Sequence, residues 1–235
     1  MRWFTLAISV PDERIYADQA RKILASNAPE NFPQDLLHYG PDGIPHKGLA
    51  KIRFGARKGT ILVHAIGGPA SALLRAESIN ILSCYEKHYG RDLDMQTSGG
   101  VYDKAIQSKM TRYRIPTLIL QQSPAAYKRI KADLELPGTP AATEMAAEKI
   151  RDGLVRQFED LGFYLEDYEF AVSGVEIKGN DTGKFVPVEI KPGVFGLCAK
   201  NVEFTSNLSL HGPWHVGHLT SRGYGLILRA DKRSH

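Results

Sequence analysis

Apolar residues in the first part of the chain alternate between the spacing of strands and that of a helix. Residues 4–10 have the branched, apolar character of a strand, and residues 15–24 place their apolar side chains on one helical face. The Pro-Asp-Glu sequence at residues 11–13 predicts the start of that helix, because acidic residues favour the positive end of the helix dipole. Residues 49–54 and 60–66, with a glycine-bounded turn between them, predict a β-hairpin.

The pattern after the hairpin completes a recognisable order of elements. Prolines and glycines in residues 30–48 predict an ordered loop between the first helix and the hairpin. A second apolar stripe over residues 73–85 predicts one helix ending at Gly90, and an extended segment around residues 93–107 follows it. The resulting order, β-α-β-β-α-β, is the ferredoxin-like pattern.

The second half again combines strands with helices. A strand over residues 113–121 precedes a longer helix that ends at Gly162. The apolar stripe of this helix consists of Ile150, Leu154, Phe158 and Leu161. Later strands are predicted over residues 168–177, 185–190, 194–198, 202–210 and 225–229. We therefore predict an α+β protein with two domains, residues 1–110 and 111–235.

Composition places the chain among ordinary globular proteins. Hydrophobic residues make up 43% and charged residues 24% of the 235 residues, which excludes disorder, collagen-like repeats and a coiled coil. The longest apolar runs are far below the roughly 18 residues of a membrane span, and the apolar start is too short for a signal peptide, so we expect no membrane partner. Cys84 and Cys198 are too few for a disulfide framework, so a reducing cytoplasm is expected.

The distribution of charge changes the picture more than the net charge of +4. Residues 43–76 contain six basic residues and no acidic one. Residues 104–131 contain seven more, again without an acid: Lys104, Lys109, Arg112, Arg114, Lys128, Arg129 and Lys131. Segregated positive stretches favour a polyanion bound through its phosphates, and the alternative is a solvated basic face.

The most informative stretch lies near the C-terminus, where a predicted strand runs into a glycine-rich loop and then into a last strand. The loop contains Gly212, Gly217, Gly223 and Gly225, interleaved with His215, His218 and Arg222. Because glycine lets the backbone approach a phosphate closely, the loop is a candidate phosphate site. The alternative is a glycine-rich turn that only closes the sheet.

Residues 217–225, GHLTSRGYG, resemble the C-terminal glycine-rich loop of the RAMP superfamily, in which a glycine and five further residues precede glycine-hydrophobic-glycine. The chain is most similar to the CRISPR-associated endoribonucleases that cut precursor CRISPR RNA within its repeats. His215 stands where family members often carry another glycine, and the helical residues 121–154 resemble the helical finger of the type IV branch. The resemblance implies two tandem ferredoxin-like (RRM-like) domains. It also implies RNA contacts from Gly217, His218, Arg222, Gly223, Gly225 and the basic residues of 104–131.

The resemblance further implies a metal-independent reaction, in which the ribose 2′-OH attacks the adjacent phosphate and leaves a 2′,3′-cyclic phosphate and a 5′-OH. This reaction needs a base, a proton donor and cations. The family places its acid/base residue in or just after the first helix, where this chain has His38 and His46, and histidine titrates near pH 6.5. Some type IV members are thought to use arginines instead, so Arg21 is the alternative.

The implied partners are the repeat hairpin, which stays bound after cleavage, and other subunits of a CRISPR effector complex. Two alternatives remain open: a catalytically silent RAMP protein that binds CRISPR RNA, and a DNA-binding or scaffold protein. No cofactor or metal is expected, because His211, His215 and His218 lie among helix-breaking residues without a nearby carboxylate. Phosphate-loop, nucleophile-elbow and His-Glu-x-x-His motifs do not occur.

Overall fold

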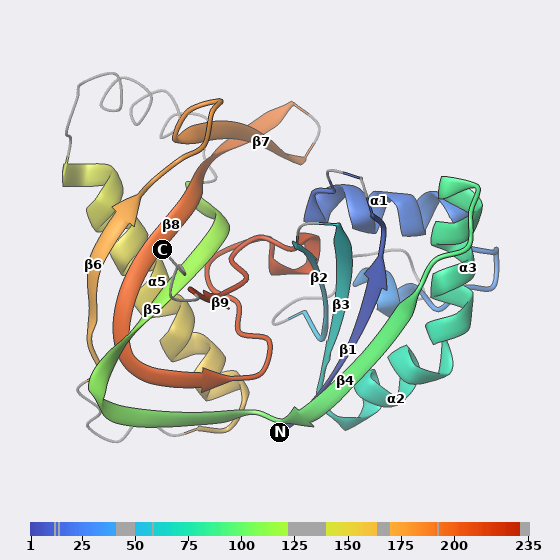
Figure 1. Cartoon of the computed structure of the whole chain (residues 1–235), viewed down its shortest axis with the longest axis horizontal. Coiled ribbons are helices and arrows are strands. Elements are labelled where there is room, and N and C mark those ends of the chain that lie inside the picture. Colours follow the sequence, from blue (N-terminus) through green and yellow to red (C-terminus); the bar gives the residue numbers. More distant parts are fainter. Residues whose placement is uncertain are drawn as a thin grey trace. The chain divides into compact units, whose positions relative to one another are not determined.

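The protein is described by a computed structural model, shown in Figure 1. It describes residues 1–11, 13, 15–40, 50–57, 59–121, 140–163, 170–191 and 193–230. The chain divides into two compact units. The first unit comprises Met1–Tyr102 with Thr220–Gly223, and the second comprises Asp103–Leu219 with Tyr224–His235.

The first unit contains an antiparallel sheet with the strand order of a ferredoxin-like fold. Its strands are β1 (Arg2–Ser9), β2 (Ile52–Arg57), β3 (Thr60–Ile66) and β4 (Met95–Val101), in the order β2-β3-β1-β4. The predicted hairpin is confirmed, but its turn is tighter than predicted. Residues 55–57 continue β2 because Gly55, Ala56 and Arg57 pair with Leu62, Ile61 and Thr60.

Helices cover one side of this sheet (Figure 1). They are α1 (Ala17–Asn27), the 3-10 turn η1 (Gln34–Leu37), α2 (Gly68–Ala76) and α3 (Ser78–Tyr89). The predicted start of the first helix at residues 11–13 is wrong, since Val10 still donates its N–H to Gly59 (2.8 Å) and α1 begins only at Ala17. The single second helix is also wrong, because Glu77, at φ −89° and ψ 4°, divides it into α2 and α3.

The core of the first unit lies between the sheet and these helices. It includes Leu6, Ile8, Leu24, Ile61, Val63, Leu74, Ile81 and Tyr85. Each large side chain of this kind stabilises the fold by roughly 1.5–3 kcal/mol when fully buried. The Tyr85 hydroxyl also donates to the Ala20 carbonyl (3.0 Å), which links α3 to α1. The alternating apolar residues of the sequence thus face the helices.

The second unit repeats the strand order around one long helix. Its strands are β5 (Asp103–Gln121), β6 (Val172–Ile177), β7 (Phe185–Lys191), β8 (Val194–His211) and β9 (Leu228–Arg229). The order is β6-β8-β5-β9, with β7 as an additional strand on β8. Helix α5 (Pro140–Asp160) packs against β5 and β6. The predicted α+β class with two ferredoxin-like folds is confirmed.

Two details of the second sheet differ from the sequence expectation. The two strands predicted over residues 194–198 and 202–210 form one strand, β8, because both pair with β5 and Asn201 adopts a positive φ between them. The last strand is shorter than residues 225–229, since Gly225 donates its N–H to Thr117 within the loop. Of the predicted helical finger, residues 122–139 lie outside the described residues and residues 140–154 belong to α5.

Two properties of the described residues concern membranes and metal ions. No helix there combines the length and apolarity needed to span a bilayer. The same part of the chain holds no group of three or more His, Cys, Asp or Glu side chains placed to bind a metal ion.

Candidate active site and nucleic-acid interface

The glycine-rich loop connects β8 to β9, at the position where the first unit has α2 and α3. The loop folds back on itself through two backbone hydrogen bonds. The Val216 N–H donates to the Gly225 carbonyl (2.9 Å), and the Ile227 N–H donates to the Trp214 carbonyl (2.8 Å). Gly225 also donates to the Thr117 carbonyl of β5 (2.7 Å), which fixes the loop to the sheet. These bonds make the loop a defined structure, as a binding site requires.

The glycines of the loop are needed by the packing of the protein itself. A Cβ at Gly225 would lie 1.7 Å from the Val216 carbonyl oxygen, and its φ of +77° disfavours other residues. Gly217 also has a positive φ, and a Cβ there would lie 3.1 Å from the Leu118 side chain. At Gly223 a Cβ would lie 2.1 Å from the Ala17 Cβ. These glycines therefore shape the loop, and their contact with RNA stays a prediction.

The tip of the loop belongs to the first unit. The short 3-10 turn η2 (Thr220–Arg222) and Gly223 pack against β2 and α1. Arg222 is half-buried on this turn. The predicted RNA-binding arginine thus lies in the same unit as the helix that carries Arg21.

Two cations lie on the face of α5 that meets the loop. Gly153 of α5 brings the helix close, since a Cβ there would be 2.6 Å from the Val216 Cβ and 2.8 Å from the Gly217 nitrogen. Lys149 and Arg156 lie four residues before and three residues after Gly153, and therefore share its helical face. We call Lys149 and Arg156 the α5 cation cluster, and His218 of the loop lies near it.

The positive charges of Lys149 and Arg156 both act on the imidazole of His218. Partial burial, followed by the positive charges of Lys149 and Arg156, lowers the pKa of His218 below its ordinary value. The lowered pKa favours the neutral imidazole, which can accept a proton. A bound phosphate would reverse part of this effect, because its negative charge favours the imidazolium form.

The structure brings together two of the predicted catalytic residues, Arg21 and His38. Arg21 of α1 donates an Nη2–H to the Leu37 carbonyl at 2.6 Å, and its guanidinium carbon lies 5.2 Å from the centre of the Tyr39 ring. His38, between these two contacts, ends η1 in the left-handed conformation (φ 63°, ψ 34°). Arg21 therefore positions the turn that carries His38, whereas the sequence presented the two as alternatives.

One atom of Arg21 has no hydrogen-bond partner among the described residues. Its Nε is buried in a side chain that otherwise contacts the loop after η1. A buried, unpaired donor costs about 1–3 kcal/mol, so this N–H is a candidate contact for a phosphate oxygen. His46, the other predicted acid/base residue, lies outside the described residues.

The predicted basic stretch of residues 104–131 lies partly on β5. Lys104, Lys109, Arg112 and Arg114 belong to this strand, whereas Lys128, Arg129 and Lys131 lie outside the described residues. Arg112 forms an ion pair with Glu203 of the neighbouring strand β8. Glu176 of β6 is opposite Glu203 in the sheet register. A stretch without acids in the sequence is thus next to acids in space.

Sequence reasoning missed Lys149 and Arg156. Both lie on α5, and the apolar stripe of this helix identifies only its opposite, core-facing side. The available signal was Gly153, because glycine in a helix interior costs about 1 kcal/mol relative to alanine and so indicates a close contact. The basic residues that flank it at helical spacing would then have been candidates.

The first unit also contains a buried polar row that is structural. Thr5, His64 and Arg53 are opposite one another on β1, β3 and β2, and all three are almost completely buried. The Thr5 hydroxyl and the His64 Nδ1 are 2.9 Å apart. Burial, with a contribution from Arg53, lowers the pKa of His64 to about 3. This histidine is neutral throughout the physiological range.

Comparison with known proteins decides the family. A family model of the type IV CRISPR-associated endonuclease Csf5 matches residues 1–232. The chain belongs to this family. The predicted relationship to CRISPR-associated endoribonucleases of the RAMP superfamily, and to the type IV branch, is confirmed. No curated protein matches the chain significantly.

Solved structures agree on the fold. The structure titled "Csf5, CRISPR-Cas type IV Cas6 crRNA endonuclease" aligns with a TM-score of 0.75 at 19% identity, covering 98% of this chain and 100% of that chain. "Crystal structure of Cas6b" aligns with a TM-score of 0.66 at 15% identity and the same coverage. "Crystal structure of CRISPR RNA processing endoribonuclease Cas6b" gives 0.61 at 15% identity, also with the same coverage.

Proposed function

We propose that this endonuclease cuts precursor CRISPR RNA within its repeats, without a metal ion, and keeps the hairpin product as a subunit of an effector complex. The observation that carries the proposal is the α5 cation cluster beside a rigid glycine-rich loop, in a chain of the Csf5 family. Phosphates of the RNA stem would bind there, because an A-form major groove is too narrow for side chains to read.

In the proposed reaction, a base removes the proton of the ribose 2′-OH, and the 2′ oxygen forms a bond to the adjacent phosphorus. The bond from phosphorus to the 5′ oxygen breaks, and that oxygen takes up a proton. The products are a 2′,3′-cyclic phosphate and a 5′-OH. Arg21, through its unpaired Nε–H, would stabilise the additional negative charge on the phosphate, which is the step at which fixed donors contribute most.

His38 and His46 are the proposed acid and base. Arg21 holds the Leu37 carbonyl, so it would also fix the direction of the neighbouring His38. A rigid side chain is required, because proton transfer needs heavy atoms within about 2.6–3.2 Å of each other. This division of tasks makes Arg21 and the histidines partners in one site.

The first test is cleavage of a repeat hairpin by purified protein in EDTA. We expect a cut that persists in EDTA and is abolished by a 2′-deoxy sugar at the nucleotide before the cut, because that sugar lacks the nucleophile. Dependence on Mg²⁺ with tolerance of the deoxy sugar would contradict the mechanism. Tight hairpin binding without a cut would favour the silent RNA-binding protein, and equal competition by duplex DNA would favour the DNA-binding alternative.

The second test assigns the residues. We expect His38→Ala or His46→Ala to lower the single-turnover cleavage rate by at least about tenfold with little change in hairpin affinity, as is usual for a general acid or base. Arg21→Ala should lower the rate as well, because the variant loses both the phosphate contact and the support of His38. Lys22→Ala is the matched control, since Lys22 is the exposed neighbour on α1 and pairs only with Asp18 in the described structure. Equal rates in all four variants would remove this site from the mechanism.

A further inference from the structure

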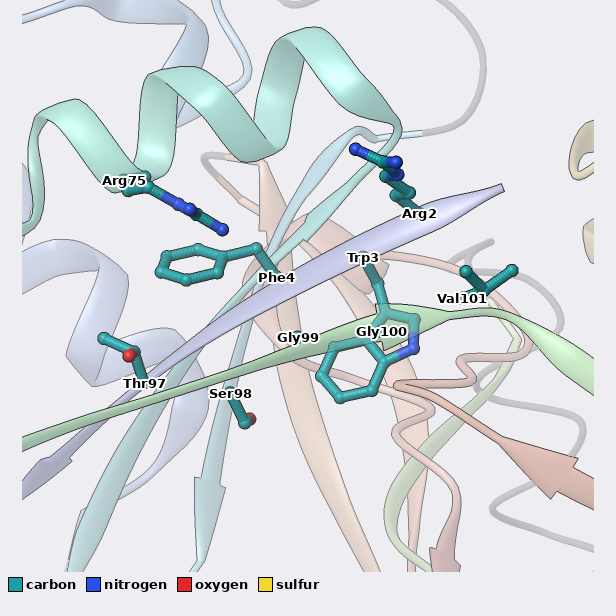
Figure 2. A pocket seen from close by; sticks show the side chains of 9 residues that line it. All are labelled: Arg2, Trp3, Phe4, Arg75, Thr97, Ser98, Gly99, Gly100 and Val101. Atoms are coloured by element: carbon teal, nitrogen blue, oxygen red, sulfur yellow. The ribbon is translucent and has the colours of Figure 1, made fainter.

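A pocket of about 400 Å³ lies at the edge of the first sheet, in a part of the unit that the proposed mechanism does not use. Its walls are Arg2, Trp3 and Phe4 of β1, Arg75 of α2, and residues 97–101 of β4 (Figure 2). None of these residues is acidic. The pocket is therefore positively charged and open to an anionic ligand.

The two arginines lie on the side of the sheet that α2 covers. Arg2 and Phe4 alternate with Trp3 along β1, so they face α2 while Trp3 faces the opposite side. The Arg75 guanidinium carbon lies 4.8 Å from the centre of the Phe4 ring, which supports its side chain in an exposed position (Figure 2). Two guanidinium groups thus border one cavity, and guanidinium is well suited to bind phosphate.

Strand β4 forms an open edge of the sheet, between the side that α2 covers and the side that Trp3 faces. It is the last strand of the order β2-β3-β1-β4, and residues 96–101 are exposed. Gly100 is opposite Trp3, and a Cβ there would lie 3.2 Å from the indole ring. Because the adjacent Gly99 and Gly100 carry no side chains, a ligand can reach across the edge from the arginines to the indole.

The hydrogen-bonding pattern leaves donors directed into this space. The backbone N–H of Ser9 donates to the Asp94 carbonyl, and that of Tyr102 donates to the Met1 carbonyl, both at 2.8 Å. Hydrogen-bonded pairs alternate along an antiparallel ladder, so Gln96, Ser98 and Gly100 form the backbone hydrogen bonds to β1. Thr97, Gly99 and Val101 then direct their backbone groups away from β1. In addition, the buried Nε1–H of Trp3 has no hydrogen-bond partner among the described residues. A buried donor of this kind is stabilised by a ligand that accepts its hydrogen bond.

We propose that this pocket binds one nucleotide of a single-stranded RNA segment that flanks the repeat hairpin. Arg2 and Arg75 would hold the phosphate, and the Trp3 indole N–H would donate to an oxygen of the base or ribose. This inference rests on the proposed function, because it takes repeat RNA as the substrate. An acidic peptide strand added to β4 would satisfy only the backbone groups of the edge and leave the indole donor unpaired, so a nucleotide accounts for more of the donors.

The experiment measures binding of a fluorescein-labelled, single-stranded oligouridylate to the full chain by fluorescence anisotropy. We expect Arg75→Ala to raise the Kd by about tenfold, which corresponds to the loss of a hydrogen bond to a charged group. Trp3→Phe, which keeps an aromatic ring and removes the N–H, should also raise the Kd. Lys87→Ala removes an exposed cation of α3 in the same unit and should change the Kd by less than about twofold.

Competitors separate the possible ligands. We expect unlabelled oligouridylate to displace the probe far better than inorganic phosphate or a short oligoglutamate peptide. Displacement by oligoglutamate at equal or lower concentration would overturn the proposal in favour of strand addition. Displacement by inorganic phosphate at the same concentration as oligouridylate would overturn it in favour of a simple anion site.

The same preparation is then assayed for cleavage of the repeat hairpin. If wild-type protein cuts the hairpin but Arg75→Ala and Lys87→Ala bind oligouridylate equally, the pocket proposal fails and the proposed function stands. If Arg75→Ala weakens oligouridylate binding and no variant or wild type cuts the hairpin, the pocket is supported as a single-strand site and the proposed cleavage fails.

Discussion

The two units have the same strand order but close their sheets differently between the third and fourth strands. In the first unit the connection is α2 and α3, which bury Leu74, Ile81 and Tyr85 in the core. In the second unit it is the glycine-rich loop, whose backbone packs against Gly153 of α5. The loop buries apolar side chains of its own, among them Trp214, Val216 and Leu226, and part of it lies beside the cations of α5. The comparison teaches that one strand order can be closed either by two helices or by a packed glycine-rich loop that lies beside cations.

Histidines in the two units follow the same division. His64 is almost completely buried between Thr5 and Arg53, and its lowered pKa of about 3 is mainly an effect of burial. His218 is only half-buried, and the charges of Lys149 and Arg156 contribute to its lowered pKa. His64 is therefore inaccessible to a ligand, whereas the imidazole of His218 is partly accessible.

The largest expected effect is on stability, at the glycine that fixes the loop. We expect Gly225→Ala to lower the free energy of unfolding by at least about 3 kcal/mol, because the new Cβ would meet the Val216 carbonyl at a positive φ. Urea denaturation followed by circular dichroism measures this change.

Gly90→Ala is the matched control in the first unit. Gly90 also has a positive φ (+64°), but no atom lies within 4 Å of its Cβ position, so only the backbone cost of about 1–2 kcal/mol applies. Equal losses of unfolding free energy in the two variants would show that the Val216 carbonyl does not crowd a Cβ at residue 225.

The next effect is the pH dependence contributed by His64. Because its pKa is lower in the folded state than in the unfolded state, the unfolded chain binds the proton first. Stability is therefore retained above about pH 6.5 and lost as the pH falls toward 3, with a slope of up to about 1.4 kcal/mol per pH unit. Urea denaturation of wild type and His64→Gln across this range should show a shallower slope in the variant. Parallel slopes would mean that His64 is not the group responsible.

The smallest effect is expected at Arg112 on β5. Its charge is paired with Glu203, so Arg112→Ala should change hairpin affinity by less than about twofold. Glu203→Gln frees the guanidinium and should increase the affinity. A large loss of affinity in Arg112→Ala would instead place the RNA on this face of the second sheet, and filter binding at fixed salt distinguishes the two results.

The sequence predicted the fold wherever periodicity and turn residues agreed. Strands β1 to β3 and the end of α5 near Gly162 follow directly from apolar spacing and glycine. The division between α2 and α3 was not predictable, because the apolar stripe continues across Glu77 and only the backbone reveals the break. The union of two predicted strands into β8 depends on pairing with β5, which is a tertiary contact.

The candidate site was predictable in part, for a similar reason. The glycine-rich loop and His218 could be found from residue type and order, and Arg21 and His38 from the resemblance to the CRISPR-associated endoribonucleases. Lys149 and Arg156 become candidates only when α5 is placed against the loop. The pairing of Arg112 with Glu203 was also hidden, since the two residues are adjacent only across the strands β5 and β8.

The central claim is that the α5 cation cluster binds the phosphates of the repeat hairpin, and the salt dependence of hairpin affinity tests it most directly. The double variant Lys149→Ala/Arg156→Ala is compared with Lys22→Ala/Lys87→Ala, which removes two exposed cations from the first unit. We expect the first double variant to lose at least about tenfold in affinity and to reduce the slope of log affinity against log salt by about one to two. The control should match wild type. Identical affinities and salt slopes in the two double variants would contradict the claim.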